Sequence, residues 1–216
     1  MDNKRARLAR ARLYIVLDAA VADWDRLLSV ADQAVGAGAD IVQIRAKDVS
    51  GEDVLTFSEK ILPLVRDRAL YIVNDDPCLA RVCRADGVHV GQDDAGIAQA
   101  REIMGDSALV GVSCQTMDQA QAAEAGGADY IGFGSVFKTL TKPGRRPMDL
   151  SLLNDVLAAV RIPVFPIGGI TEENAACLLQ AGARRAAVTR AVCLAEDVPA
   201  AVKQLITILD NTQATT

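Results

Sequence analysis

The stretch VGAGADIVQI, at residues 35–44, indicates the fold because it joins the end of one predicted helix to the start of a predicted strand. A segment of helical period precedes it, and its β-branched second half is typical of a strand. Glycine just past a helix adopts the left-handed conformation that ends the helix. The same arrangement recurs as EAGGADYIGF at residues 124–133 and as LQAGARRAAV at residues 179–188. The repeated unit is a strand, a loop, a helix, a glycine and the next strand.

This unit repeats along the whole chain. We predict strands at Leu13–Leu17, Ile41–Arg45, Leu70–Asn74, Gly87–Val90, Leu109–Ser113, Tyr130–Gly132, Val164–Ile167 and Arg185–Val188. We predict helices at Trp24–Ala37, Gly51–Arg66, Pro77–Cys83, Ile97–Met104, Met117–Ala125, Ser151–Ala159, Glu172–Gln180 and Val198–Leu209. Such alternation predicts parallel strands with right-handed crossovers. Eight units in 216 residues match a single α/β domain of the (β/α)8 TIM-barrel type, with a doubly wound open sheet as the alternative. Residues 1–12 and 210–216 are expected to be flexible termini.

Composition narrows the function classes. Half of the residues are hydrophobic, 24% are charged and the net charge is −5, which argues against nucleic acid as a partner. The basic N-terminus leads into an apolar run that stops at Asp18, which is too short for a signal peptide. No apolar run is long enough for a membrane span. The five cysteines include no Cys-x-x-Cys pair. We expect a cytoplasmic protein with small-molecule partners, and the sequence leaves open whether it forms a homo-oligomer.

The predicted barrel places function in the loops after the strands, and the second strand ends in an unusual set of side chains. Gln43, Arg45 and Lys47 alternate along VQIRAKD, so they point to the same side of the strand. Two cations inside a barrel are costly unless an anion meets them. The pattern therefore favours a polyanionic substrate, and the alternative is a structural ion pair with carboxylates of the barrel.

Acidic residues follow the third and fourth strands. Asp76 precedes a proline and a predicted helix, so we interpret it as the helix cap, which leaves Asp75 as a candidate metal ligand. After the fourth strand, spacing alone does not choose between Asp93 and Asp94. Carboxylates on two adjacent strand ends can share one Mg²⁺, whose remaining ligands are water and phosphate oxygens. His89, the only histidine, is expected to be packed or hydrogen-bonded.

Three further loops carry groups that suit phosphate. Ser113 ends the fifth strand, and Gly168 and Gly169 follow the seventh, where backbone N–H groups of such barrels often hold phosphate. The loop KTLTKPGRRP, at residues 138–147, follows the sixth strand and offers hydroxyl groups and an ammonium group. Its glycine and prolines indicate a lid, and the alternative is a solvated surface loop.

Together these motifs resemble the thiamine phosphate synthase and thiazole tautomerase family, and within it the synthases, from about Leu13 to Leu205. The resemblance is carried, in this order along the chain, by QIRAKD, VNDD, GVHVGQDD, GVS, DYIGFGSVFKTLTK and IGGI. It implies a Mg²⁺-dependent transferase that joins hydroxymethylpyrimidine diphosphate to a thiazole phosphate and releases diphosphate. It also implies a dissociative reaction, in which the pyrimidine C–O bond ionises before the thiazole nitrogen attacks.

The resemblance implies a role for each matching residue. The residues implied to bind the pyrimidine diphosphate are Gln43, Arg45, Lys47, Asn74, Ser113 and Lys142, and of these Arg45, Lys47, Ser113 and Lys142 are the catalytic candidates. The Gly-Gln-x-Asp motif selects Asp94 over Asp93, so Asp75 and Asp94 are implied to hold Mg²⁺. The thiazole phosphate is implied to contact Thr139, Thr141, Gly168, Gly169 and the segment at Thr189 and Arg190.

The chain departs from the family pattern near the thiazole phosphate. Thr189 and Arg190 replace a pair of small residues, so Arg190 either strengthens phosphate binding or changes the ligand. Three alternative functions remain: a thiazole tautomerase, a non-catalytic phosphate-binding barrel, and another phosphate-handling barrel enzyme such as a sugar-phosphate isomerase. The tautomerase is implied to need a histidine near the fifth strand, where this chain has Cys114 and Gln115.

Overall fold

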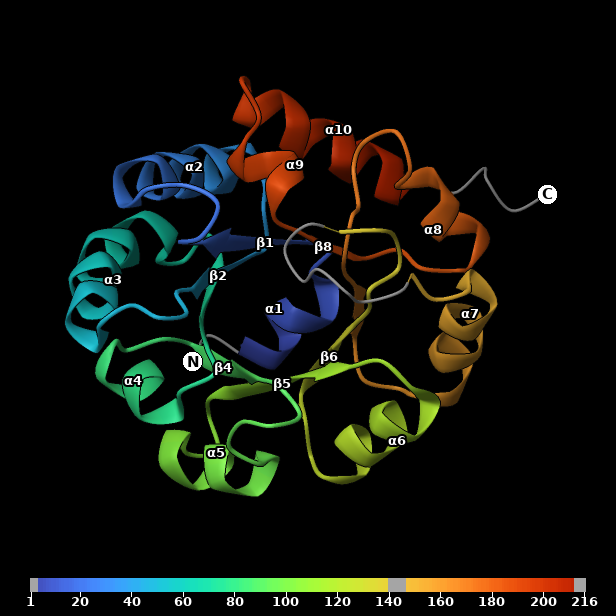
Figure 1. Ribbon diagram of the computed structural model, residues 1–216, viewed down its shortest axis with the longest axis horizontal. Coiled ribbons are helices and arrows are strands. Elements are labelled where there is room, and N and C mark those ends of the chain that lie inside the picture. The colour runs from blue at the N-terminus through green and yellow to red at the C-terminus, as the bar shows by residue number, and fades with distance from the viewer. Residues whose placement is uncertain (1–3, 140–146, 212–216) are drawn as a thin grey trace.

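The computed structural model describes residues 4–139 and 147–211, and within them eight strands form one parallel sheet that curls into a barrel (Figure 1). The strands are β1 (Leu13–Asp18), β2 (Ile41–Arg45), β3 (Leu70–Asn74), β4 (Gly87–Val90), β5 (Leu109–Cys114), β6 (Tyr130–Phe133), β7 (Val164–Pro166) and β8 (Ala186–Val188). Their order is β7-β6-β5-β4-β3-β2-β1-β8, and a bridge between Ile167 and Ala187 joins the two ends. The predicted (β/α)8 barrel is confirmed, and the open sheet is wrong.

Helices surround the barrel. They are α2 (Trp24–Ala37), α3 (Gly51–Val65), α4 (Pro77–Val82), α5 (Ile97–Met104), α6 (Met117–Ala125), α7 (Leu150–Ala159), α8 (Ala176–Gln180), α9 (Arg190–Cys193) and α10 (Val198–Asp210). Of these, α9 was not predicted, and α8 begins four residues later than predicted. Gly38 ends α2 with φ 110°, and its N–H donates to the carbonyl of Ala34, as the glycine pattern predicted. Among the described residues, no helix is long and apolar enough to cross a membrane.

The barrel has two apolar layers. Outward-facing strand residues such as Val42 and Ile44 pack against the helices. The smaller inner layer fills the barrel axis and includes Tyr14, Tyr130 and Phe165. Gln43, between Val42 and Ile44, lies on the inner side and is 4% exposed. Alternation along the strand therefore directs polar side chains of strand ends into the barrel.

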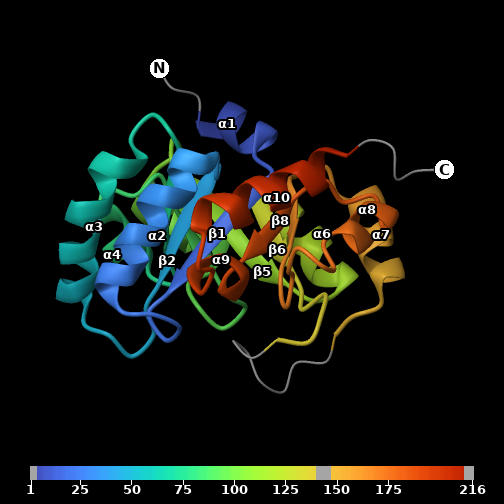
Figure 2. The same ribbon diagram turned by 90° about the horizontal axis from the view of Figure 1, so that it is seen from above.

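The N-terminal segment differs from the expectation of a flexible terminus. Residues Lys4–Arg10 form helix α1, which lies across the amino-end opening of the barrel (Figures 1 and 2). Leu8 of α1 and Ala11 after it are 2% and 1% exposed, because they pack on the inner apolar layer. At the other terminus, α10 continues to Asp210, and residues 212–216 lie outside the described residues.

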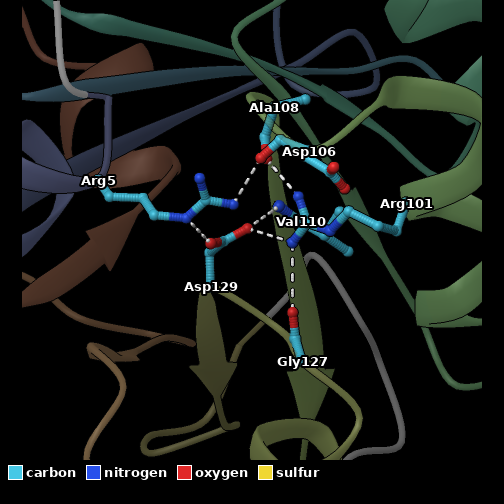
Figure 3. A network of polar contacts seen from close by, with 7 residues as sticks. All are labelled: Arg5, Arg101, Asp106, Ala108, Val110, Gly127 and Asp129. Carbon is cyan, nitrogen blue, oxygen red and sulfur yellow. Dashed lines mark hydrogen bonds and ion pairs between the residues drawn. The ribbon is translucent and has the colours of Figure 1, made fainter.

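A polar network holds α1 on the barrel (Figure 3). One carboxylate oxygen of Asp129, just before β6, accepts from Arg5 Nε at 2.7 Å. The other accepts from Arg101 Nη2 of α5 at 2.6 Å and from the N–H of Val110 in β5 at 2.8 Å. Arg5 also donates to the carbonyl of Asp106 at 2.8 Å. This end of the barrel is therefore closed by a helix whose Arg5 binds both a carboxylate and a backbone carbonyl of the barrel.

Candidate active site

A cavity of about 520 Å³ opens at the carboxyl ends of the strands, opposite α1. Every predicted site residue that the structure describes lines it: Gln43, Arg45, Lys47, Asn74, Asp75, Asp94, Ser113, Thr139, Gly168, Gly169, Thr189 and Arg190. Thr141 and Lys142 lie outside the described residues. Residues at or after the ends of seven strands, β2 to β8, therefore meet at one place, while their roles stay predictions.

Both cations at the end of β2 have carboxylate partners. Arg45 Nη1 lies 2.7 Å from Asp18 Oδ2, and Asp18 is 1% exposed at the end of β1. Lys47 Nζ lies 3.2 Å from Asp75 Oδ2 in a more exposed pair. The structural ion pair that the sequence left open is thus present at Arg45, although the same guanidinium lines the cavity. Asp18 was not among the predicted site residues, because an acid at a strand end carries no periodic signal.

Asp75 and Asp94 bring two carboxyl groups together. Burial raises the pKa of Asp75 above its usual value, and a hydrogen bond and charge repulsion from Asp94 raise it further, while Lys47 lowers it. Asp94 is held in place because its Oδ2 accepts from the N–H of Gly91 at 2.7 Å. Among the described residues, no group of three or more histidine, cysteine or acidic side chains is placed to hold a metal.

The local backbone explains the different roles of the two acids after β3. Asp76 caps α4 as predicted, since its Oδ1 accepts from the N–H of Leu79 at 3.0 Å. Asp75 has a φ of 67°, a left-handed conformation that few residues other than glycine, asparagine and aspartate adopt readily. Its own N–H donates to the carbonyl of His89 at 2.8 Å. The turn therefore directs the carboxylate of Asp76 to the start of α4 and that of Asp75 to the cavity.

Gly168 and Gly169 have φ values of 107° and 65°, which favour glycine. A Cβ at Gly168 would lie 2.1 Å from Ser135 Oγ, and one at Gly169 would lie 2.2 Å from the carbonyl oxygen of Lys138. The two glycines thus allow the connection after β7 to pack against residues 135–138. Their part in phosphate binding stays a prediction.

Sequence reasoning missed two tyrosines that line or underlie the cavity. Tyr14 and Tyr130 read as ordinary strand residues, and only the barrel brings their hydroxyl groups to 2.9 Å from one another. Tyr14 also donates to Gln43 Oε1 at 2.7 Å, and His89 Nδ1 lies 3.3 Å from the Tyr130 hydroxyl oxygen. Burial raises the pKa of both phenols above the usual value. His89 is hydrogen-bonded, as expected.

Arg190 and Thr189 line the cavity at the end of β8, three strands away from β3 and Asp75 in the barrel. Arg190 is the first residue of α9 and is exposed, and Thr189 precedes it. The carbonyl of Thr189 accepts from the N–H groups of Val192 and Cys193 at 3.2 and 2.9 Å. Arg190 therefore adds a cation to the wall of the cavity at the start of α9.

Comparison with known proteins agrees with this arrangement. Residues 13–192 match the family model for thiamine monophosphate synthase. The thiamine-phosphate synthase of Chlorobium luteolum is 40% identical over 189 residues, which are 87% of this chain and 89% of that protein. The one of Chloroflexus aurantiacus is 40% identical over 210 residues, which are 96% of this chain and 97% of that protein.

The backbone of this chain also agrees with that of a solved structure. Thiamine phosphate pyrophosphorylase from Pyrococcus furiosus has a TM-score of 0.84 to this chain at 33% identity. The superposition covers 96% of this chain and 98% of that one. Because the family model spans most of the chain and the relatives align over nearly their whole length, this chain belongs to the thiamine monophosphate synthase family.

Proposed function

We propose that this chain catalyses the transfer of the hydroxymethylpyrimidine unit from its diphosphate to a thiazole phosphate, giving thiamine phosphate and diphosphate. The observation that carries the proposal is that one cavity gathers all twelve described site residues implied by the motifs. The names of the relatives, thiamine-phosphate synthase, support the same reaction. A cavity of about 520 Å³ lies in the range typical of small-molecule sites.

The diphosphate would bind on the side of β2 and β3. Arg45 and Lys47 supply two cations there, and each also has an acidic neighbour that limits its mobility. Gln43 and Asn74 add amide groups that are linked by a hydrogen bond of 2.5 Å. Groups fixed in this way stabilise charge that develops on a leaving diphosphate without reorganising first. Among the described residues that line the cavity we assign no general base, and a dissociative reaction needs none.

Asp75 and Asp94 fit a Mg²⁺ ion. Two adjacent carboxylates are the donor set that Mg²⁺ takes from protein, with water and phosphate oxygens completing its octahedron. The raised pKa of Asp75 fits this view, because a cation between the two carboxylates would relieve their repulsion. When bound, Mg²⁺ would neutralise charge on the diphosphate. The acids would then hold the diphosphate end of the substrate at the β3 and β4 side of the cavity.

The thiazole phosphate would bind across the cavity, near Thr139, Gly169 and Arg190. Cations and backbone N–H groups suit a phosphate monoester, and Arg190 supplies one cation in that wall. Thr141 is assigned to this phosphate, and Lys142 to the pyrimidine diphosphate, from the motif alone, since both lie outside the described residues. In this arrangement the two substrates approach one another over the barrel axis, which aligns the attacking nitrogen with the pyrimidine carbon.

The test is a direct assay of the purified chain with both substrates and Mg²⁺. We expect thiamine phosphate and diphosphate to form in equal amounts, and EDTA to stop the reaction until Mg²⁺ is restored. If no thiamine phosphate forms while the chain isomerises a thiazole, the tautomerase alternative is correct. Binding of both ligands without any turnover would favour the non-catalytic barrel.

A further inference from the structure

A continuous chain of hydrogen bonds crosses the inside of the barrel at the floor of the cavity, and all of its members except Tyr130 line the cavity. It links side chains from six different strands through contacts of 2.9, 3.3, 2.9, 2.7 and 2.5 Å. In spatial order the members are Ser113, His89, Tyr130, Tyr14, Gln43 and Asn74. Its two ends, Ser113 and Asn74, line the cavity on different strands.

The direction of the chain follows from counting protons. Tyr14 has one hydroxyl hydrogen and donates it to Gln43 Oε1 at 2.7 Å. In the contact of 2.9 Å between the two phenols, Tyr130 must therefore donate and Tyr14 accept. At the other side of Gln43, its amide nitrogen donates to Asn74 Oδ1 at 2.5 Å. In this half of the chain every hydrogen bond is therefore donated in the direction from Tyr130 toward Asn74.

The same reasoning fixes the histidine. Because Tyr130 donates its only hydroxyl hydrogen to Tyr14, it can only accept in the contact of 3.3 Å with His89, so Nδ1 of His89 must carry the hydrogen. A neutral imidazole carries one ring hydrogen, so Nε2 is an acceptor and receives the hydroxyl hydrogen of Ser113 at 2.9 Å. Ser113 is then left with oxygen lone pairs toward the cavity, and Asn74 with its amide N–H groups.

The surroundings keep the rings in this arrangement. Tyr130 is fully buried, and a Cβ at Gly111 on the neighbouring strand would lie 2.1 Å from its Cζ atom. A Cβ at Gly132 would lie 3.2 Å from Cε1 of His89. Phe165 packs edge-on against Tyr130 with ring centroids 5.8 Å apart. Two glycines therefore make room for the two rings, and the packing leaves them little freedom to turn.

We propose that Tyr14 and Tyr130 are positioning residues: the chain through them holds His89 as its Nδ1–H tautomer and presents Ser113 as an acceptor and Asn74 as a donor to the ligand. This inference rests on the proposed function and deepens it, because Ser113 and Asn74 are two of the residues that the family resemblance assigns to the pyrimidine diphosphate. An aminopyrimidine offers the matching pattern, with an N–H donor beside ring nitrogen acceptors. The tyrosines touch no reacting atom and act only through their neighbours.

The tautomer can be measured without any ligand. His89 is the only histidine of the chain, so in untagged ¹⁵N-labelled protein the two ring nitrogens give the only imidazole signals. We expect the Nδ1–H pattern in the wild type and a shift toward Nε2–H in Tyr130→Phe, which removes the acceptor of Nδ1–H. An Nε2–H or a doubly protonated ring in the wild type would overturn the proposal.

Tyr71→Phe is the matched control. Tyr71 is as buried as Tyr130, and its hydroxyl lies 2.7 Å from Ser58 on the helix side of the sheet, away from the chain. The Tyr71→Phe variant also loses one hydrogen bond of a buried phenol, so it should lower the free energy of unfolding about as much as Tyr130→Phe does. We expect it to leave the His89 signals unchanged. If Tyr71→Phe moved them as far as Tyr130→Phe does, the shift would report general loosening and the proposal would fail.

Kinetics provide a second, separate readout. In Tyr14→Phe and Tyr130→Phe we expect KM for the pyrimidine diphosphate to rise about tenfold, the effect of losing one well-made polar contact. KM for the thiazole phosphate should change less than about twofold, which a general loss of structure would not produce. Equal changes in both KM values would overturn the positioning role.

The two proposals fail in different ways. If the wild type makes no thiamine phosphate but shows the Nδ1–H tautomer and its loss in Tyr130→Phe, the proposed function is wrong while the hydrogen-bond chain stands. If the wild type is active but its histidine carries the hydrogen on Nε2, the chain is wrong while the function stands.

Discussion

The two ends of the barrel use the same residue types for opposite purposes. At the amino end, Asp129 has three donors, among them Arg5 and Arg101 (Figure 3). Helix α1 covers this opening (Figures 1 and 2). At the carboxyl end, Asp75 lies against a second acid and one lysine, and all of them line a cavity. A carboxylate whose oxygens are all paired with donors of the protein contributes to stability. A carboxylate that lies beside a second acid and only one cation is suited to bind a ligand. Four experiments test this contrast.

Arg45 belongs to both categories, so its removal should have the largest effect on stability. Arg45→Ala leaves Asp18 buried at 1% exposure without its cation, which we expect to lower the free energy of unfolding by about 3 to 5 kcal/mol. Chemical denaturation measures this loss. The double variant Arg45→Ala/Asp18→Asn should recover most of the stability but not the activity. Recovery of both would reduce Arg45 to a structural residue.

Asp129 tests the closed end. Asp129→Asn removes a charge shared by two guanidinium groups, and we expect the free energy of unfolding to fall by about 2 to 3 kcal/mol. Denaturation is again the measurement, and kcat and both KM values should match those of the wild type. Asp106→Asn is the control, because only its backbone carbonyl takes part in the network. A change in KM would mean that the two ends are coupled.

Mg²⁺ binding should distinguish the acidic residues that hold the metal from the one that only lines the cavity. At tens of times its Kd, Mg²⁺ should stabilise the wild type by about 2 kcal/mol, because it binds only the folded chain. We expect a thermal shift on adding Mg²⁺ in the wild type, and none in Asp75→Asn or Asp94→Asn. Asp93→Asn removes a neighbouring carboxylate that also lines the cavity, and its shift should be retained. Loss of the shift in Asp93→Asn alone would reassign the ligand.

Lys47 should show the smallest change in stability. Its pair with Asp75 is half exposed on the lysine side, so Lys47→Ala should alter the free energy of unfolding by less than about 1 kcal/mol. Turnover should nevertheless fall by about a hundredfold, as for the loss of one preorganised charge partner. Lys60→Ala on the exposed face of α3 is the control for both measurements. Normal turnover in Lys47→Ala would remove it from the site.

The sequence predicted the barrel and the bounds of β2, β3 and β4 correctly, because each β-branched run is bounded by a glycine or by polar residues. It did not predict α1, where only the packing of Leu8 and Ala11 on the barrel distinguishes a helix from a basic tail. Helix α9 is four residues long, which is too short for a periodic signal. Both misses arise from tertiary contacts that no local pattern encodes.

The candidate site was predicted in a similar way. Gln43, Arg45 and Lys47 were found because polar residues at alternate strand positions are unusual in a barrel. Tyr14 and Tyr130 were missed, since a tyrosine in a strand is ordinary and their contact joins residues 116 positions apart. The partner of Arg45 was missed for the same reason. Sequence patterns identify which side chains face the cavity, and the closed barrel decides what lies beneath them.

Gly111 and Tyr130 are opposite one another on β5 and β6, and the phenol ring fills the volume that any side chain at Gly111 would need. During evolution each of these two residues therefore constrains which substitutions the other can accept. A larger residue at Gly111 would clash with the ring of Tyr130. A smaller residue at position 130 would leave a cavity in the barrel and remove the hydroxyl group that contacts Tyr14. Descendants of this chain can leave this combination only by changing both positions together, so drift that freely alters the helix surfaces should stop at this pair.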